Sequence, residues 1–289
     1  MHVRYSLLAS QATTALFVLL WGSAAIFTRW GLDNASPMAL LVFRFLVALV
    51  ALAPLAIVRR RWLPAPGTRL QTAATGLMLI GGYSVCYFAA MATGVTPGLI
   101  ATIMGLQPLL TLCVVERRLH GRRLSGLLLA LAGLVLLVWR SLAASPMATA
   151  GILFALAALL LMTFGALWQK RSRQAPADVL PLQYAVSLGL CLLIAPVSGF
   201  RFTVNAGLII PVLFLGLLIS VVAQLLLYRL LSAGNIVNVT SLFYLVPAIT
   251  ALLDYLLLGN RLPAAAMIGM MAIVGGIVLV FRTAKVRAG

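Results

Sequence analysis

The charged residues of this chain stand at the edges of long uncharged runs, and this spacing restricts the chain to a membrane fold. No Asp, Glu, Lys or Arg occurs in residues 5–28, 70–115, 141–169, 202–228 or 230–253. Apolar residues make up 63% of the sequence and charged residues 9%, which lies outside the range of soluble domains. Because a helix needs about 20 apolar residues to cross a bilayer, the sequence predicts an all-α membrane protein with many spans.

Turn signals divide the chain into ten expected spans. The uncharged run 70–115 is too long for one helix, and residues 93–98 (Thr-Gly-Val-Thr-Pro-Gly) are its only break. The first span is too long for a signal-peptide core and is expected to stay as a helix. The ten spans are expected at residues 6–28, 37–58, 70–92, 96–115, 124–139, 147–168, 179–198, 208–231, 235–258 and 264–281.

Basic residues fall unevenly on the two sides of these spans. With the N-terminus inside, the inner segments hold Arg4, Arg59, Arg60, Arg61, Arg69, Arg117, Arg118, Arg122, Arg123, Lys170, Arg171, Arg173, Arg229, Arg282, Lys285 and Arg287. The outer segments hold Arg29, Arg140, Arg201 and Arg261. Since Lys and Arg collect on the cytoplasmic side, both termini are expected in the cytoplasm. The net charge of +17 therefore reflects topology, not nucleic-acid binding.

The chain also repeats itself. An offset of about 139 residues relates Thr102 to Ser241, Pro108 to Pro247 and Thr111 to Thr250. Two glycine pairs with a spacing of seven recur in the same order, Gly126 with Gly133 and Gly269 with Gly276. We expect one repeat over residues 1–140 and a second over 147–282, each with five helices. Because five is odd, the second repeat is inverted in the membrane, which is the architecture of secondary transporters.

Several short motifs, taken in order, resemble a known family. They are Leu20-Trp21-Gly22-Ser23, Ser36-Pro37, Arg44-Phe45, Tyr87-Phe88-Ala89-Ala90, Gln107-Pro108, Pro247, Leu257-Leu258-Gly259, Arg261-Leu262 and the two glycine pairs. Over about residues 10–282 the chain resembles the drug/metabolite transporter (DMT) superfamily, in its proteins with two EamA-type domains. The resemblance implies a ten-helix carrier of the cell inner membrane with a central cavity, which exports amino acids or related metabolites.

The chain departs from the family pattern after the ninth span. Where the family often has Glu, this chain has Asn260. In the first repeat, Glu116 follows Pro108 at a shorter distance than Asn260 follows Pro247. Either the fourth span is shortened or Glu116 is not the equivalent residue.

The two repeated prolines are expected to bend their helices. Pro108 lies about 18 Å into the fourth span at a rise of 1.5 Å per residue, near the midplane, and Pro247 lies at the same depth in the ninth. A proline inside a helix removes a backbone hydrogen bond, and a membrane tolerates this only where protein or a cavity compensates. We interpret the pair as a kink or gate, against a fixed bend for packing.

The expected cavity residues are polar or aromatic side chains inside spans. They are Trp21, Tyr83, Tyr87, Gln107, Gln224 and Tyr244. The amides of Gln107 and Gln224 suit a zwitterionic solute, although helix-to-helix hydrogen bonds would explain them equally well. Trp21 could stack on an apolar substrate or pack against lipid or a neighbouring helix. Tyr228, four residues after Gln224, is interpreted as an interfacial anchor.

Two ions fall inside spans. Arg44 lies about 10 Å from the outer surface by helix rise, where it could bind a substrate carboxylate or serve as a structural cation. Asp254, near the outer end of the ninth span, could couple to protons, be interfacial or pair with Arg44. No acidic residue is expected at the midplane of any span.

Other functional classes fit less well. Catalysis needs a nucleophile with a base or a metal set, but His2 and His120 lie outside the spans and the carboxylates are unpaired in sequence. Cys86, Cys113 and Cys191 lie inside spans, so neither a disulfide framework nor a metal cluster is expected. The chain has no Walker-type loop for ATP, and no cofactor is expected. A multidrug or amphiphile exporter, and a channel or lipid-handling protein, stay open as alternatives; the oligomeric state is not predicted, and a monomer is compatible with the sequence.

Overall fold

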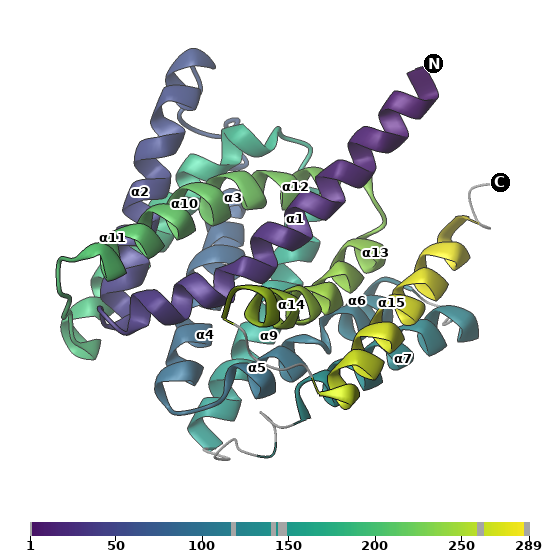
Figure 1. Cartoon of the computed structure of the whole chain (residues 1–289). Helices are drawn as coiled ribbons and strands as arrows, with labels where there is room; N and C mark the ends of the chain where they lie inside the picture. Colours follow the sequence, from purple (N-terminus) through teal and green to yellow (C-terminus); the bar gives the residue numbers. More distant parts are fainter. Residues whose placement is uncertain (1, 117–119, 140–142, 144–148, 259–262, 286–289) are drawn as a thin grey trace. The chain divides into compact units, whose positions relative to one another are not determined.

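The structure is a computed structural model that describes residues 2–116, 120–139, 143, 149–258 and 263–285. Side chains are described in these ranges except at 2–11, 97–98, 254, 257–258 and 283–285. The described chain is helical and has no β-strand; a single antiparallel bridge joins Ala35 to Phe202. Its helices, which Figure 1 labels, group into two units, and each unit takes residues from both halves of the chain.

Unit 1 comprises Met1–Val85 and Trp168–Ala233. Its elements are α1 (His2–Leu32), α2 (Pro37–Val58), α3 (Arg69–Gly76), a π-helix η1 (Leu77–Gly82), α10 (Pro176–Ser198), α11 (Ala206–Leu213), a π-helix η2 (Phe214–Ala223) and α12 (Gln224–Ala233). Helix α10 packs along α2 and against α3 and η1, while η2 packs against α1 and α2. Proline at the start of α2 and of α10 suits the first turn of a helix, where no backbone donor is needed.

Unit 2 comprises Cys86–Leu167 and Gly234–Gly289. Its elements are α5 (Pro97–Met104), α6 (Gln107–Val115), α7 (Gly121–Leu137), α13 (Ile236–Ser241), a 3₁₀ turn η3 (Leu242–Tyr244), α14 (Leu245–Leu258) and α15 (Ala264–Lys285). Two helices cross the division between the units, α4 (Tyr83–Ala92) and α9 (Thr149–Arg171). Within unit 2, α7 packs along α15 and α6 packs against α13.

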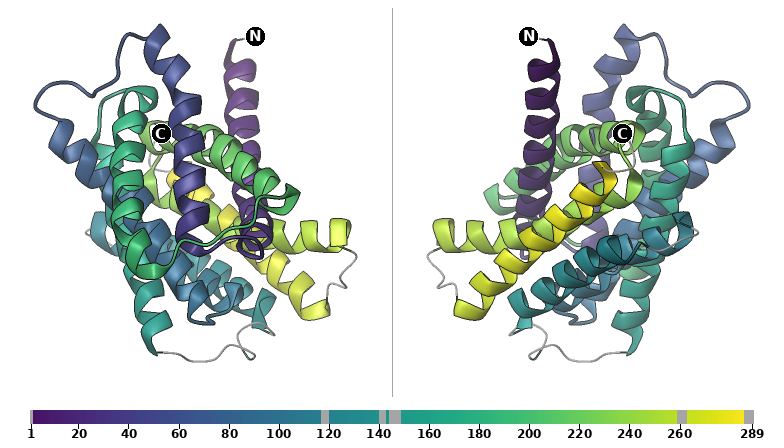
Figure 2. Two further views of the ribbon diagram at one scale, coloured as in Figure 1. Left: turned by 90° about the vertical axis from the view of Figure 1, so that its left-hand side faces the viewer. Right: turned by 90° about the vertical axis from the view of Figure 1, so that its right-hand side faces the viewer.

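The contact between α7 and α15 depends on the two glycine pairs (Figure 2). A Cβ atom on Gly126 would lie 2.8 Å from the carbonyl oxygen of Gly276, and one on Gly133 would lie 2.6 Å from that of Gly269. The reverse placements, on Gly276 and Gly269, meet backbone at 2.4 and 2.5 Å. Glycine therefore lets the two backbones come into contact, as small residues do in membrane helix pairs. The two helices run in opposite directions along this contact.

Eight helical segments of the described chain are long and apolar enough to cross a membrane. They are Ala12–Leu32, Pro37–Val58, Arg69–Ala92, Thr149–Arg171, Pro176–Ser198, Ala206–Ala233, Ile236–Leu253 and Ala264–Arg282. The expected fourth and fifth spans are also helical, but Leu99–Val115 and α7 are shorter. The chain is thus a multi-pass helical membrane protein, and the number ten stays a prediction.

Candidate functional site

Arg44 lies within α2 and is held inside unit 1 by a partner from η2. Its Nε atom donates to the Ser220 hydroxyl at 2.8 Å, and Tyr184 donates its hydroxyl proton to the Ser220 carbonyl at 2.5 Å. The ring of Tyr184 also contacts Phe45, with centroids 5.6 Å apart. Arg44 forms no ion pair with any residue in the described ranges. An arginine that lacks an acidic partner is able to bind a carboxylate.

A second set of hydrogen-bonded polar side chains includes Gln183 of α10, the residue before Tyr184. Tyr228 donates its hydroxyl proton to Gln183 Oε1 at 2.6 Å, and Gln183 Nε2 donates to Gln169 Oε1 at 2.9 Å. Gln224, the first residue of α12, interacts with the same Tyr228 hydroxyl. The expectation of Tyr228 as an interfacial anchor is wrong, because its side chain is 1% exposed and hydrogen-bonded within unit 1.

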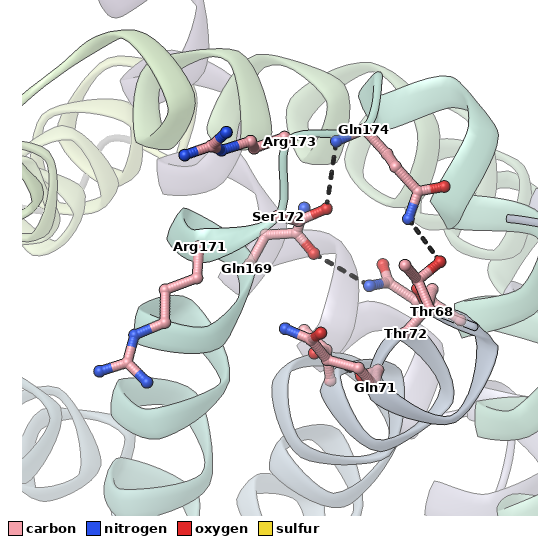
Figure 3. Close-up of a pocket in the computed structure, with 10 residues that line it drawn as sticks. Thr68, Gln71, Thr72, Gln169, Arg171, Ser172, Arg173 and Gln174 are labelled. Carbon is pink, nitrogen blue, oxygen red and sulfur yellow. Dashed lines mark hydrogen bonds between the residues drawn. The ribbon is translucent and has the colours of Figure 1, made fainter. Parts of the chain in front are cut away.

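A pocket of about 250 Å³ opens at the end of this set of polar side chains (Figure 3). It is lined by Thr68, Gln71, Thr72, Thr75, Gln169, Arg171, Ser172, Arg173, Gln174 and Gln183. None of these residues was predicted as a site residue. One signal could have found them: α3 begins its span with polar side chains, and Thr72 and Thr75 lie three apart, on one face.

Asp178 joins the start of α10 to the residues that follow α2. Its carboxylate accepts hydrogen bonds from Arg59 Nε at 2.7 Å and from Arg61 Nη1 at 3.4 Å, and the Asp178 side chain is 6% exposed. The hydrogen bond to Asp178 and its charge raise the pKa of the Arg59 guanidinium. A raised arginine pKa adds stability at every pH below the ordinary value, and the gain is lost only in strong alkali. The Arg59 guanidinium therefore stays positively charged at any working pH.

We expect Asp178→Asn to lower the melting temperature in detergent by about 3 °C, because both arginines lose a charged acceptor. The difference from wild type should shrink in high salt, since Arg59 and Arg61 are partly exposed and salt screens such charges. Asp33→Asn is the control, because Asp33 pairs with Arg29 at a more exposed site. An equal effect of both substitutions would contradict the prediction.

In unit 2 the two repeated prolines lie at helix breaks. Helix α5 ends at Met104, and Pro108 occupies the first turn of the new helix α6. Pro247 likewise lies in the first turn of α14, after the 3₁₀ turn η3. The expected mid-helix kinks are thus interruptions, and proline is tolerated there because first-turn residues donate no helical hydrogen bond. Their role as a gate stays a prediction.

Two predicted cavity residues flank these breaks. Gln107 begins α6 and is 1% exposed, and Tyr244 ends η3 and is fully buried. The Gln107 amide nitrogen and the Tyr244 hydroxyl have no hydrogen-bond partner in the described part of the chain. A buried polar atom without a partner costs about 1–3 kcal/mol, so both groups are candidates to bind a solute.

The other predicted residues are divided between the units. Tyr83 begins α4 directly after η1 and interacts electrostatically with Arg44. Trp21 is half-buried and contacts Phe17, with ring centroids 5.2 Å apart. Tyr87 is half-buried against the apolar core of unit 2, around Ile100. The side chain of Asp254 and the whole of Asn260 lie outside the described residues.

The family model for the EamA-like transporter family matches this chain twice, over residues 10–139 and 144–282. The chain belongs to the EamA-like transporter family. This confirms the resemblance drawn from its motifs. Membership indicates a transporter rather than an enzyme.

The relatives of this EamA-like chain are named as transporters, and the similarity covers nearly their whole lengths. A probable amino-acid metabolite efflux pump of Salmonella typhimurium is 26% identical over 94% of this chain and 96% of its own. The inner membrane transporter YedA of Escherichia coli is 27% identical over 92% and 89%, and a transporter of Archaeoglobus fulgidus is 27% identical over 92% and 94%. A solved crystal structure shares the fold, with a TM-score of 0.82 at 20% identity over 97% of this chain and 99% of the other.

Proposed function

We propose that this EamA-like chain is a secondary carrier of the inner membrane that exports small metabolites, with neutral or aromatic amino acids as its substrates. The observation that carries the proposal is the double family match, which covers almost the whole chain. The name of the Salmonella relative, an amino-acid metabolite efflux pump, supports this substrate class. A multidrug exporter, and a channel or lipid-handling protein, are the alternatives that experiment must separate.

The proposed architecture is ten spans in two inverted repeats, residues 1–140 and 147–282, that work by alternating access. The contact of α7 with α15 supports inversion. The glycine pairs of the two repeats meet in reverse order, Gly126 with Gly276 and Gly133 with Gly269, so the helices run in opposite directions along the contact. Corresponding helices of two repeats with the same orientation would run in the same direction. The uneven distribution of Lys and Arg supports cytoplasmic termini.

The test is transport by the full chain reconstituted in liposomes, with labelled neutral amino acids and unlabelled competitors. Saturable, competed flux is expected for a carrier. Flux that does not saturate would indicate a channel and overturn the proposal. Saturable flux of an organic cation without flux of amino acids would support a carrier but contradict the proposed substrate class. Tyr83→Ala should reduce the flux, with Tyr255→Ala, an exposed position in α14, as control.

Gln107→Leu offers a sharper test, because stability and flux should move in opposite directions. Leucine removes a buried amide nitrogen that has no described partner, so we expect stabilisation by about 1 kcal/mol. If the amide binds substrate, flux should fall about tenfold, which corresponds to about 1.4 kcal/mol. Thermal unfolding in detergent and flux in liposomes measure the two effects. A variant that loses stability and flux together would mean that Gln107 has a structural role.

A further inference from the structure

The pocket of unit 1 has a floor of buried side chains, in which a hydrogen bond joins the amides of Gln183 and Gln169 (Figure 3). Tyr228 donates to the oxygen of Gln183, so the Gln183 nitrogen donates to the oxygen of Gln169. The oxygen of Gln169 thereby accepts one hydrogen bond, while its amide nitrogen donates to no residue in the described part of the chain. Because an amide nitrogen carries two N–H donors, Gln169 presents N–H donors to the pocket.

The rest of the lining is polar and includes two arginines. Gln169, Gln183, Thr72 and Thr75 are buried, so the floor is built from ordered side chains rather than mobile surface groups. Arg171 and Arg173 also line the pocket; both are exposed, and their side chains extend away from the amides (Figure 3). No Asp or Glu is among the described residues that line the pocket. The Gln169 N–H donors and the positive charges of Arg171 and Arg173 favour an anionic group.

The volume limits the size of the ligand. Clefts for drug-sized molecules usually measure about 300–1,000 Å³, and this pocket is smaller, at about 250 Å³. On the proposed topology, residues 59–69 and 170–173 belong to inner segments, so the pocket faces the cytoplasm. An exporter must collect its substrate from that side.

We infer that this pocket is a cytoplasmic binding site for small carboxylate-bearing solutes, in which the Gln169 amide N–H receives the carboxylate and Arg171 and Arg173 attract it. The inference rests on the proposed function for its role as a loading site. It narrows the substrate class to amino acids and related carboxylates, and it disfavours organic cations.

Binding to the purified full chain in detergent tests the inference with three ligands that share one ring. They are 3-phenylpropionate, L-phenylalanine and phenethylamine. The first two, which carry a carboxylate, should bind and compete with each other, while phenethylamine should bind at least tenfold more weakly. Equal or tighter binding of phenethylamine would overturn the proposed ligand class.

Substitutions then locate the site. Gln169→Glu replaces donors by a negative charge of similar shape, so 3-phenylpropionate should bind at least tenfold more weakly while phenethylamine binds no worse. The double variant Arg171→Gln with Arg173→Gln should weaken binding of the two carboxylate ligands about threefold to tenfold. Arg229→Gln, a basic residue of an inner segment outside the pocket, should leave binding within twofold of wild type. If Gln169→Glu does not fold, Gln71→Glu at an exposed position of the same lining introduces the negative charge instead.

Binding and flux fail separately. If wild type shows saturable amino-acid flux but Gln169→Glu and Gln71→Glu bind 3-phenylpropionate like wild type, the pocket is not the site and the carrier stands. If the carboxylates bind in the pocket without any saturable flux, the site stands and the proposed carrier does not.

Discussion

Arg123→Leu is expected to destabilise the protein by about 3–5 kcal/mol, because it leaves a buried carboxylate without its main partner. Arg123 and Glu116 form an ion pair in unit 2 with side chains only 3% and 7% exposed. The other Nη atom of Arg123 donates to Asn235 at 2.7 Å and to Asn238 at 2.6 Å. One guanidinium thus joins the end of α6, the first turn of α7 and the start of α13.

The measurement is thermal unfolding in detergent, where the melting temperature should fall by about 10 °C. Arg122→Leu is the matched control, since the neighbouring Arg122 is exposed and a surface change usually costs less than about 0.5 kcal/mol. The double variant Glu116→Gln with Arg123→Leu should be more stable than Arg123→Leu alone, because the isolated charge is gone. Additive losses in this cycle would show that the pair is not coupled.

The sequence predicted the positions of the helices well where charges and prolines mark their ends. The span expected at 37–58 is found as α2 (Pro37–Val58), since Ser36-Pro37 begins a helix and three arginines follow it. The fourth and ninth spans were expected as continuous helices and are interrupted. Helix α5 ends at Met104, and at the next residue, Gly105, Leu134 of α7 approaches so closely that an added Cβ would lie 2.5 Å from its side chain. Such a break depends on packing that a single segment does not reveal.

The π-helices could not be predicted for the same reason. Segments η1 and η2 end immediately before Tyr83 and Gln224 respectively, in corresponding spans of the two repeats. Their residues are as apolar as those of ordinary membrane helices, so composition gives no signal. π-Helical turns are frequent at functional sites. The repetition in both halves suggests that the geometry belongs to the duplicated unit.

The sequence did not predict which neighbours the side chains face. A rise of 1.5 Å per residue estimates how deep a residue lies, but not which neighbour it faces. Tyr228 was therefore interpreted as an anchor although Gln183 of α10 binds its hydroxyl. Arg123 was counted only as an inner positive charge, yet it is buried and paired. The pocket was missed because its residues come from α3, α9, the following loop and α10, which lie far apart in sequence.

Gly276→Ala is expected to destabilise the protein by about 2 kcal/mol, although alanine favours helices. The added methyl group would lie 2.4 Å from the carbonyl oxygen of Gly126 and 2.7 Å from the backbone nitrogen of Ala130. Backbone cannot move aside as a flexible side chain can, so α7 and α15 must separate, and overpacking of this kind costs about 1–3 kcal/mol. Gly133→Ala should behave alike, because its methyl group would meet the Gly269 carbonyl oxygen at 2.6 Å.

The preceding residue supplies the control. At Gly275 the nearest atom to an added Cβ is in the Leu129 side chain, at 3.9 Å, which is ordinary contact. Gly275→Ala should therefore leave stability unchanged or raise it by up to about 1 kcal/mol, the difference in helix propensity. Thermal unfolding of the two variants in one detergent would give shifts of opposite sign. If both alanines stabilise the protein equally, the close approach of α7 and α15 is absent, and the reciprocal contact no longer supports inverted repeats.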